Sequence, residues 1–368
     1  MSRHKAGVVS HASEEMAKPT PLTPELVPLL LDWSHAAQRD LPWRADCDPY
    51  HILVSEIMLQ QTRAETVIPY YHRFLAALPT LSDLAAADDE TLHKLWEGLG
   101  YYSRARNLGK AAREICEKHG GRLPDDYEAL LRLPGIGDYT AGAIASIAFD
   151  CRVPAIDGNV LRVLSRVTGS YDDIADPATK KRFREELSEV IPADAGDFTQ
   201  ALIELGATVC VPNGEARCGV CPLSSVCEAA KGNLTDSLPV KRAKKARRVE
   251  KKTVLLIRDG SSTVLSKRPP KGLLSGLYEL PNVEGHLDTE AVTAYLRTLG
   301  LDPVHVERIE DAKHIFTHIE WHMIAYSVRI SSDFDGFEGA NGTMLVSNER
   351  LHAEYAIPSA FSAYTKYL

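Results

Sequence analysis

Four cysteines in the second half of the chain constrain the fold most tightly, because side chains that share one ligand fix the path of the backbone between them. They fall within 18 residues at the spacing C-x7-C-x2-C-x5-C, as Cys210, Cys218, Cys221 and Cys227. Closely placed thiolates with no histidine among them are typical of a metal centre, and zinc and an iron-sulfur cluster both accept four cysteines. The sequence therefore predicts a metal or iron-sulfur site at the end of one domain.

The other cysteines and the N-terminus argue against a disulfide framework. Cys47, Cys116 and Cys151 are scattered, as isolated buried thiols are. Residues 1–24 are polar, contain prolines and lack the apolar core of a secretion signal. We expect a disordered leader there and a cytoplasmic chain, in a compartment where disulfides are rare. No apolar run approaches the roughly 18 residues of a membrane-spanning helix, so no membrane partner is expected.

The length and the charge distribution predict two domains joined by a basic linker. A chain of 368 residues exceeds the usual size of a single core. Helical periodicity predicts a mainly α domain over residues 25–232. Lys241 to Lys252 then carries eight basic residues and one acid, and we assign residues 233–252 as the linker. The net charge of −8 excludes a general polycation, so this run is either an exposed linker or a strand that contacts phosphates.

From Thr253 the pattern changes to that of a smaller α+β domain, residues 253–368. The turn sequence Asp259-Gly260-Ser261-Ser262 lies between two apolar runs and predicts a β-hairpin. The expected elements are this hairpin of 253–257 and 263–265, a helix over 288–299, a strand over 323–330 and a helix after Pro358. In the strand, alternation places Ile324, Tyr326, Val328 and Ile330 on one face, and residues 314–318 form a loop or strand start before it.

One carboxylate occupies an otherwise almost wholly apolar helix. Glu56 lies within residues 52–59, ILVSEIML. Burial raises the pKa of a carboxyl group, which suits a general acid near neutral pH, although a structural carboxylate paired inside the core has the same pattern. Gln60, Gln61 and Thr62 follow directly, and such uncharged hydrogen-bonding side chains either read bases or simply end the helix.

Residues 133–160 combine a Gly-rich hairpin, an apolar helix and a second acid. In Leu133-Pro134-Gly135-Ile136-Gly137 the two glycines allow close backbone approach, and the helix that follows points amide donors outward. This arrangement predicts a grip on a phosphate backbone, although most such turns only reverse the chain. Asp157 lies in a bend marked by proline, glycine and asparagine, and is a candidate catalytic carboxylate.

Two further segments carry candidate ligand contacts. Residues 99–107, LGYYSRARN, interleave tyrosines with arginines around a glycine, a combination that suits base stacking and phosphate contact, although core tyrosines with surface arginines look the same. His314 and His318 flank Ile315-Phe316-Thr317, and each histidine is either a structural residue or a ligand contact.

With these motifs in view, residues 25–368 resemble the adenine DNA glycosylase family, also called the MutY family, of the helix-hairpin-helix superfamily. The resemblance is carried by residues 54–62, 98–107, 133–142 and 157–160 and by the cysteine loop. It implies a helical glycosylase domain followed by a Nudix-like domain. It also implies a 4Fe-4S cluster on the four cysteines, although the first gap is seven residues where the family usually has six.

The resemblance further implies excision of adenine mispaired with 8-oxo-7,8-dihydroguanine, or with guanine, in double-stranded DNA by a monomer that flips the adenine into a pocket. Glu56 corresponds to the acid that protonates N7 of the purine. Asp157 corresponds to the carboxylate that stabilises or traps the oxocarbenium-like sugar. Tyr139 and Asn159 match residues that assist this chemistry.

Other motif positions correspond to residues that contact DNA. Gln61 and Tyr101 match residues that wedge into the duplex, and Thr62 and Leu99 match contacts to the lesion. Phe316, Thr317 and His318 align with the loop that senses 8-oxoguanine, where the family commonly has serine at the middle position. The segment from Asp288 to Tyr295 lacks the glutamates with which a working Nudix hydrolase binds magnesium, so recognition is expected in place of pyrophosphate hydrolysis.

Two competing functions remain. A non-catalytic module that binds damaged DNA predicts loss of Glu56 or Asp157, and both are present. A bifunctional glycosylase and lyase of the endonuclease III type uses a lysine for Schiff-base chemistry at the position of Tyr139. The sequence therefore favours a monofunctional glycosylase that leaves an abasic site.

Overall fold

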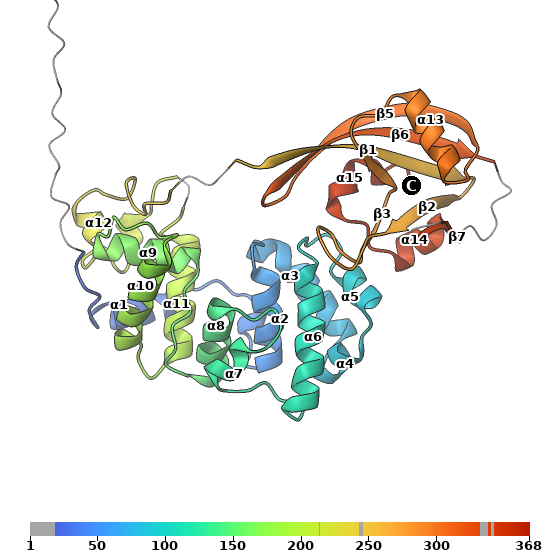
Figure 1. Ribbon diagram of the computed structural model, residues 1–368. Coiled ribbons are helices and arrows are strands. Elements are labelled where there is room, and N and C mark those ends of the chain that lie inside the picture. The colour runs from blue at the N-terminus through green and yellow to red at the C-terminus, as the bar shows by residue number, and fades with distance from the viewer. Residues whose placement is uncertain (1–18, 213, 243–245, 332–337, 340–341) are drawn as a thin grey trace, which may run out of the picture. The chain divides into compact units, whose positions relative to one another are not determined.

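The computed structural model describes residues 19–212, 214–242, 246–331, 338–339 and 342–368, which form two compact units (Figure 1). The first unit comprises the chain up to Asp40 and from Ala141 to Arg242. The second comprises Leu41 to Thr140 and Ala243 to the C-terminus. Most of the predicted leader and residues 243–245 of the basic run lie outside the described residues.

The described end of the predicted leader is part of the fold. The Thr20 N–H donates a hydrogen bond to the Thr168 carbonyl over 2.9 Å, and Leu22 packs against the core of the first unit. The expectation of disorder over residues 1–24 is therefore wrong for these last residues, which use a main-chain bond and an apolar contact that their polar composition does not reveal.

The first unit is helical. Its helices are α1 (Leu26–Ala37), the greater part of α8 (Asp138–Phe149), α9 (Gly158–Thr168), α10 (Pro177–Val190), α11 (Ala195–Thr208), the 3-10 turn η2 (Cys218–Val220) and α12 (Glu228–Lys231). Leu30, Val160 and Phe183 belong to a single core in which α1, α9, α10 and α11 meet. Helix α9 ends at Gly169, whose φ of +65° gives the left-handed cap that stops a helix. The cysteine loop begins after α11, which is part of this packed helical core.

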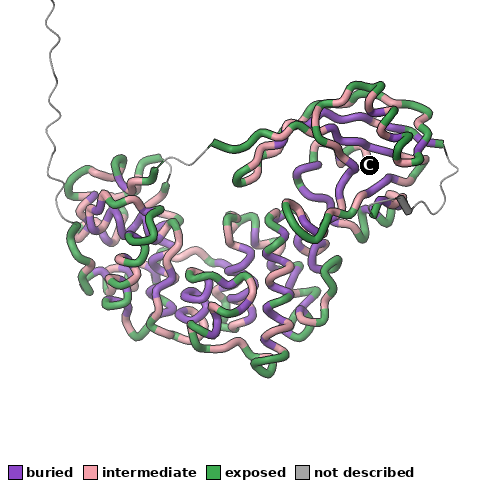
Figure 2. The backbone as a smooth tube through the Cα atoms, viewed as in Figure 1, coloured by how far each residue is buried: buried purple, intermediate pink, exposed green. Residues whose placement is uncertain are grey.

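The second unit contains a helical part and a sheet. Its helical elements are η1 (Pro42–Arg44), α2 (Pro49–Leu59), α3 (Ala64–Ala77), α4 (Leu81–Ala86), α5 (Asp89–Leu95), α6 (Ser103–Lys118) and α7 (Tyr127–Leu131). Side-chain caps explain several starts, since the carboxylates of Asp48, Asp88 and Asp126 accept the first free N–H groups of α2, α5 and α7. Burial in Figure 2 follows the inner faces of these helices.

Over the described residues, the sheet has eight strands and is mixed. Its strands are β1 (Arg248–Asp259), β2 (Ser262–Lys267), β3 (Tyr278–Glu279), β4 (Asn282–Glu284), β5 (Pro303–Ile315), β6 (Ile319–Ile330), β7 (Glu338–Gly339) and β8 (Thr343–Ser347), in the order β5-β6-β1-β2-β8-β7. β3 pairs with β2 and β4 with β1. β1 and β6 run parallel, whereas every other pair is antiparallel.

Helices cover both faces of this sheet. Val254 and Leu256 of β1 share a core with Leu351 of α14 (Asn348–Glu354), the turn η3 (Ser359–Phe361) and α15 (Ser362–Thr365). The alternate residues Leu255 and Ile257 face a second core, which includes α13 (Thr289–Thr298) (Figure 1). Because successive residues of a strand point to opposite faces, the strands contribute side chains to both cores. Helices cover each core on its outer side.

The predicted elements of the C-terminal part are confirmed, with several corrections: β3, β4, β7 and β8 were not predicted, and the strand expected over 323–330 begins at Ile319. The hairpin is present, with Arg258 opposite Thr263, and α13 ends just before Gly300. Strand β5 was not predicted, because its many charged residues conceal the alternation, and α14 was missed for its short length. The linker prediction of 233–252 extends too far, since β1 begins at Arg248 and pairs there with Ile319.

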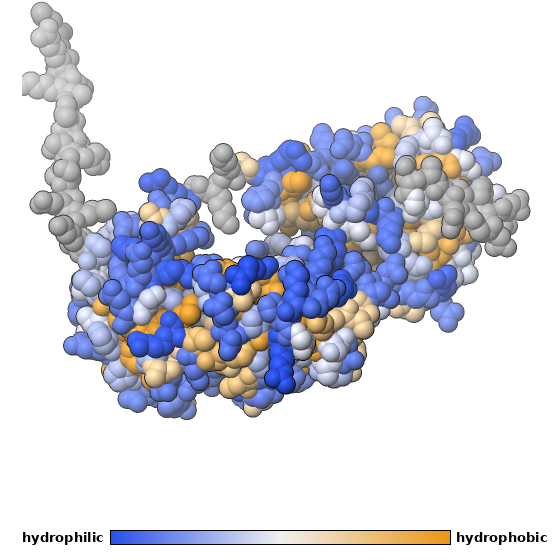
Figure 3. Space-filling view, turned by 60° about the horizontal axis from the view of Figure 1, so that its bottom comes forward, coloured by the Kyte–Doolittle hydropathy of each residue, from blue (hydrophilic) through white to orange (hydrophobic). Residues whose placement is uncertain are grey.

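The surface is polar with scattered apolar patches. On the face seen in Figure 3, hydrophobic residues form patches that hydrophilic side chains interrupt. Within the described parts of the chain, no helix has both the length and the apolar character needed to cross a membrane.

Candidate functional site

Asp157 of the first unit caps the N-terminus of α9. Its Oδ1 accepts hydrogen bonds from the main-chain N–H groups of Asn159 and Val160, each over 2.8 Å. Its Oδ2 accepts the Asn159 side-chain amide, also over 2.8 Å. Burial raises the pKa of Asp157, and the hydrogen bonds from Val160 and Asn159 oppose that rise without cancelling it. The carboxylate is thus desolvated and fixed in direction.

Arg162 connects this carboxylate to the cysteine loop. Its Nη2 donates to Asn159 Oδ1 over 3.0 Å and to the Gly206 carbonyl over 2.7 Å, while its Nε donates to the Cys210 carbonyl over 2.8 Å. These contacts set the orientation of the Asn159 amide, so that its NH2 group faces Asp157. A β-carbon at Gly206 would approach Asn159 Cβ to 2.8 Å, so the close packing of α11 on α9 requires glycine there.

All four predicted cysteine ligands line one pocket in the first unit, together with Arg166. The Arg166 Nη1 donates to Cys210 Sγ over 3.2 Å, and Cys227 Sγ lies 3.4 Å from the Arg166 carbonyl oxygen. Burial raises the pKa of the Cys221 thiol to about 11, and the neighbouring cysteines add to the rise. A bound cation would favour the ionised form of the Cys221 thiol by compensating its charge.

Glu56 of the second unit lies in the middle of α2 and is 6% exposed, with Leu53, Ile57 and Met58 buried around it. The predicted apolar helix with one inward carboxylate is therefore confirmed as a structural feature. Tyr139 occupies the first turn of α8 and is partly buried. Neither Asp157 nor Asn159 belongs to the same unit as Glu56 and Tyr139.

In the turn predicted to bind phosphate, Gly135 and Gly137 differ in backbone conformation and in the space around them. Gly135 has φ of +78°, and a β-carbon there would meet Asn107 Cβ at 2.6 Å, so this position requires glycine for both conformation and packing. Gly137 has ordinary backbone angles, and a β-carbon at this position would have open space for 4 Å around it. Gly137 and Asp138 are exposed at the start of the 12-residue helix α8. The open side of the turn therefore lies at Gly137.

Arg104 holds together the two loops that carry Gln61 and Tyr101. Its guanidinium donates to the carbonyls of Ile57, Met58, Gln60, Leu99 and Gly100 and to Thr62 Oγ1, over distances from 2.7 to 3.3 Å. Arg104 is 7% exposed, and burial lowers its pKa to about 10, which leaves it charged at neutral pH. The prediction of a phosphate-contacting arginine is therefore wrong for Arg104, because main-chain oxygens occupy its donors.

Gln61 and Tyr101 both adopt left-handed backbone conformations, with φ of +59° and +49°. Such angles are uncommon for residues with a side chain and are often found at functional loops. Tyr101 is 48% exposed, whereas its neighbour Tyr102 is buried and accordingly forms part of the core. Arg104 therefore maintains two strained loops, and each loop presents one of the side chains predicted to enter DNA.

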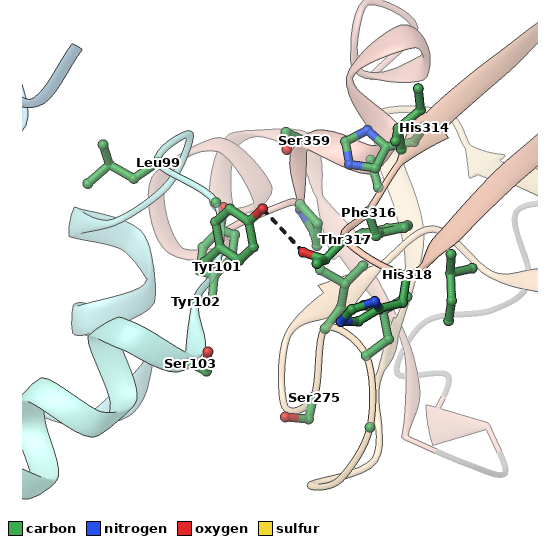
Figure 4. A pocket seen from close by; sticks show the side chains of 18 of the residues that line it. Leu99, Tyr101, Tyr102, Ser103, Ser275, His314, Phe316, Thr317, His318 and Ser359 are labelled. Carbon is green, nitrogen blue, oxygen red and sulfur yellow. Dashed lines mark hydrogen bonds between the residues drawn. The ribbon is translucent and has the colours of Figure 1, made fainter. Parts of the chain in front are cut away.

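A cavity of about 540 Å³ in the second unit collects most of the predicted lesion contacts. Its lining includes Leu99, Tyr101, Phe316, Thr317 and His318. The hydroxyls of Tyr101 and Thr317 point toward one another over 3.4 Å (Figure 4). Phe316 stacks edge-on against His314 and Trp321, with ring centroids 4.6 and 4.9 Å apart, so it supports the loop from inside.

The sequence missed the other walls of this cavity. Residues 272–275 and 358–360 also line it, and Arg106 donates a hydrogen bond to the Ser275 carbonyl. Neither segment carries a motif, and only the packing of the sheet brings both to the loop of residues 98–103. Gln61 and Thr62 do not line the cavity, but Arg104 bonds to the Gln60 carbonyl and the Thr62 hydroxyl on either side of Gln61.

Comparison with known families identifies two regions of the chain. Residues 54–193 match the family described as HhH-GPD superfamily base excision DNA repair protein, and residues 253–367 match the NUDIX domain. The predicted fold class, a helical helix-hairpin-helix domain followed by a Nudix-like α+β domain, is thereby confirmed.

Relatives cover most of the chain. The adenine DNA glycosylase of Mus musculus is 36% identical over 82% of this chain and 70% of its own length. That of Buchnera aphidicola is 31% identical over 86% of this chain and 90% of its own length. Among solved structures, a thermostable thymine-DNA glycosylase superposes with a TM-score of 0.51 at 29% identity, covering 56% of this chain and 96% of its own.

Proposed function

This chain belongs to the adenine DNA glycosylase family of base excision repair enzymes, and from that premise we propose that it excises adenine paired with 8-oxoguanine in duplex DNA. The observation that carries this specificity is the pair of facing hydroxyls on Tyr101 and Thr317 in the cavity of the second unit. 8-Oxoguanine differs from guanine in its O8 atom and its N7–H group. A threonine hydroxyl both donates to such an oxygen and accepts from such an N–H group.

Thr317 stands where the family commonly has serine, and it supplies the same hydroxyl. Its added methyl group lies in a cavity wall that already contains Leu273, Leu274 and Ile319. Since Thr317 is exposed, this methyl requires no repacking of the core. We therefore assign lesion sensing to Thr317, with Phe316 and His318 shaping the loop on each side, and Tyr101 and Gln61 entering the duplex beside it.

In the proposed reaction the adenine leaves the base stack before the bond is broken. Glu56, as the general acid, transfers a proton to N7, and the C1′–N9 bond breaks with its electron pair moving to N9. Asp157 stabilises the cationic sugar, or bonds to C1′ and leaves as a carboxylate when water adds. Water then adds its hydroxyl to C1′, and its proton returns to Glu56. The products are free adenine and an abasic site.

The position of Tyr139 supports a monofunctional reaction. A lyase needs an amine that forms a Schiff base with C1′ and opens the sugar ring. A phenol cannot form that linkage. We therefore propose that Tyr139 assists in holding the sugar or water, and that strand cleavage requires alkali or another enzyme.

The donor set at the cysteine loop fits an iron-sulfur cluster. Cys210, Cys218, Cys221 and Cys227 line one pocket. A 4Fe-4S cluster takes four cysteine thiolates, as these residues supply. The bound cluster would compensate the charge of the thiolates. It would also hold the loop in place next to α9, whose Arg162 and Arg166 donate hydrogen bonds to Cys210. Iron, zinc and acid-labile sulfide analysis of the purified protein distinguishes the two metals.

One experiment tests the proposed function against both alternatives. Single-turnover assays use a duplex with adenine opposite 8-oxoguanine or guanine, analysed with and without alkali. We expect strand breaks only after alkali, and loss of excision with retained binding in Glu56→Gln. Binding without any product would favour a non-catalytic module, while breaks without alkali would favour a lyase of the endonuclease III type. A near-wild-type rate in Glu56→Gln would remove Glu56 from its assigned role. Size-exclusion chromatography with and without the duplex tests the expected monomer.

A further inference from the structure

Lys94, in the last turn of α5, and Glu97, just after it, form an ion pair that is hydrogen-bonded to the C-terminal part of the second unit. Glu97 Oε1 accepts the Ile357 main-chain N–H over 3.0 Å. Lys94 Nζ donates to Glu97 Oε2 over 2.7 Å and to the Tyr355 carbonyl over 3.3 Å. Ile357 is 7% exposed, so its N–H group depends on the carboxylate for a partner. A charge-assisted bond of this kind is stronger than a neutral one and fixes two main-chain segments relative to each other.

Both segments joined by Glu97 continue directly into walls of the Tyr101 and Thr317 cavity. Gly98 follows Glu97 and begins the lining that runs to Ser103. Pro358 follows Ile357 and begins the lining of residues 358–360. Glu97 and Ile357 are not part of this lining, but each directly precedes a residue that is, so their hydrogen bond joins the two walls one residue outside the cavity.

The first wall has little freedom to move independently of Glu97. Gly98 has φ of +99°, and a β-carbon there would overlap Tyr70 Oη at 2.2 Å. The carbonyls of Leu99 and Gly100 are both held by Arg104. The loop from Gly98 to Tyr101 is therefore tightly constrained, and Glu97 is the contact that joins its start to Ile357.

The second wall reaches Thr317 through a row of aromatic rings. Phe361 at the end of η3 lies 6.1 Å from Trp321, and Trp321 lies 4.9 Å from Phe316, measured between ring centroids. Phe316 directly precedes Thr317. The position of Ile357 therefore affects the position of the Thr317 hydroxyl. Glu97 thus contacts the segments that lead to both hydroxyls of the pair seen in Figure 4.

We propose that Glu97 is a positioning residue that sets the spacing of Tyr101 and Thr317 and thereby the preference for adenine opposite 8-oxoguanine over adenine opposite guanine. This inference rests on the proposed function of the cavity in lesion sensing. Glu97 touches neither the reacting adenine nor its sugar in the proposed mechanism. Its effect is therefore confined to the lesion-dependent part of the rate and affinity.

The same part of the chain offers a matched control. Glu90 in α5 also bonds to the C-terminal part, through Lys267 Nζ over 3.2 Å and the Tyr278 hydroxyl over 3.4 Å. These partners belong to β2 and β3, and none of the three residues lines the cavity. Glu90→Ala therefore removes a comparable contact without releasing either wall.

The experiment compares Glu97→Ala, Glu97→Gln and Glu90→Ala in the full-length protein. Single-turnover excision rates and duplex dissociation constants are measured for adenine opposite 8-oxoguanine and opposite guanine, and the ratio for the two substrates is the readout. We expect Glu97→Ala to lower this preference about tenfold, as loss of one charge-assisted bond would, while the rate opposite guanine changes less than about twofold. Glu97→Gln keeps an acceptor for Ile357 and retains most of the preference, and Glu90→Ala retains it fully.

Several outcomes overturn the inference. An equal loss on both substrates in Glu97→Ala indicates a general structural role, and an unchanged ratio removes Glu97 from lesion sensing. If Glu97→Ala does not fold, Lys94→Met replaces it, because it removes the bonds from Lys94 to the Glu97 carboxylate and to the Tyr355 carbonyl that join the same two segments, and an unchanged ratio there is equally contrary. A wild-type protein without any preference for 8-oxoguanine contradicts the proposed function itself, and the inference with it. A wild-type preference that all variants keep contradicts the inference alone.

Discussion

The Asn159 side-chain amide donates a hydrogen bond to the Asp157 carboxylate over 2.8 Å, and Arg162 holds the other end of that amide over 3.0 Å. The amide can present its NH2 group to Asp157 only while its oxygen faces the guanidinium. The ionised state of Asp157 is therefore supported by a residue one turn further along α9. This relationship leads to the first two predictions.

Asn159→Ala should slow excision and move the acidic limb of the pH–rate profile to higher pH. Burial already raises the pKa of Asp157, and the Asn159 donor opposes that rise. Its removal raises the pKa further. Because the proposed mechanism uses the ionised carboxylate, activity is then lost at a higher pH as the solution is acidified. At neutral pH we expect a loss of about 10- to 100-fold, the usual effect of one bond to a charged group. A uniform rate decrease with an unmoved acidic limb would contradict this account.

Arg162→Lys should impair excision and cluster retention together. Lysine keeps the charge, but it cannot serve Asn159, Gly206 and the Cys210 carbonyl at once, as the planar guanidinium does. The measurements are the iron-to-protein ratio and the single-turnover rate of the same preparation. Arg242→Lys is the control, because Arg242 is exposed and pairs only loosely with Asp173 over 3.7 Å. Normal iron content and a normal rate in Arg162→Lys would show that the link is dispensable.

Tyr139→Lys should introduce strand cleavage without alkali. The substitution places an amine in the first turn of α8, at a partly buried position where its pKa is expected to fall toward neutrality. Borohydride trapping of the protein on DNA detects the Schiff base, and Tyr139→Phe is the control that lacks an amine. Absence of any trapped complex, with adenine excision intact, would show that position 139 does not reach the sugar.

Local patterns allowed much of the fold to be predicted. Helix α2 with Glu56, the turn at Gly135, helix α9 after Asp157 and the hairpin before Thr263 all follow from periodicity, caps and turn residues within a few positions. Strand β5 was missed because its exposed charges obscure the alternation, and the start of β1 was assigned to the linker because its basic residues suggest solvent exposure.

The candidate site was less accessible to such reasoning, because its walls meet only through packing. Tyr101 and Thr317 are 216 positions apart, and no local signal places their hydroxyls 3.4 Å from each other. Similarly, arginine in an aromatic segment suggests a surface contact to phosphate, whereas Arg104 is turned inward to main-chain carbonyls. The residue types were therefore predictable from motifs, while the partners that orient them were not.

Arg104→Lys should destabilise the second unit, because an ammonium group cannot reach all six acceptors to which the planar guanidinium donates hydrogen bonds. We expect the free energy of unfolding to fall by about 2 to 4 kcal/mol, because buried carbonyls lose their donors. Denaturant unfolding followed by tryptophan fluorescence measures this change, with the exposed Arg122→Lys as control. Equal stability of Arg104→Lys and Arg122→Lys would show that water replaces the lost donors.

The basic run should contribute to DNA affinity through its exposed members only. Arg248 and Lys251 are exposed on the first residues of β1, whereas Lys252 is partly buried, lies 5.5 Å from the Trp321 ring centre and pairs with Glu284. A cation that contacts a phosphate releases a counterion on binding, so each such contact adds about 0.9 to the slope of log affinity against log salt. The double variant Arg248→Ala and Lys251→Ala should lower that slope by about 1 to 2.

Lys252→Gln should leave the slope unchanged, and the excision preference for 8-oxoguanine should persist in both variants, because phosphate contacts carry no base information. Equilibrium binding to the lesion duplex at several salt concentrations provides the slopes. An unaltered slope in the double variant would show that these exposed cations do not contact DNA, in keeping with the alternative of an exposed charged linker. A reduced slope would instead show that exposed cations of β1 contact phosphate groups of the DNA. These cations lie next to the loop proposed to sense the lesion, since Arg248 pairs with Ile319, which directly follows His318.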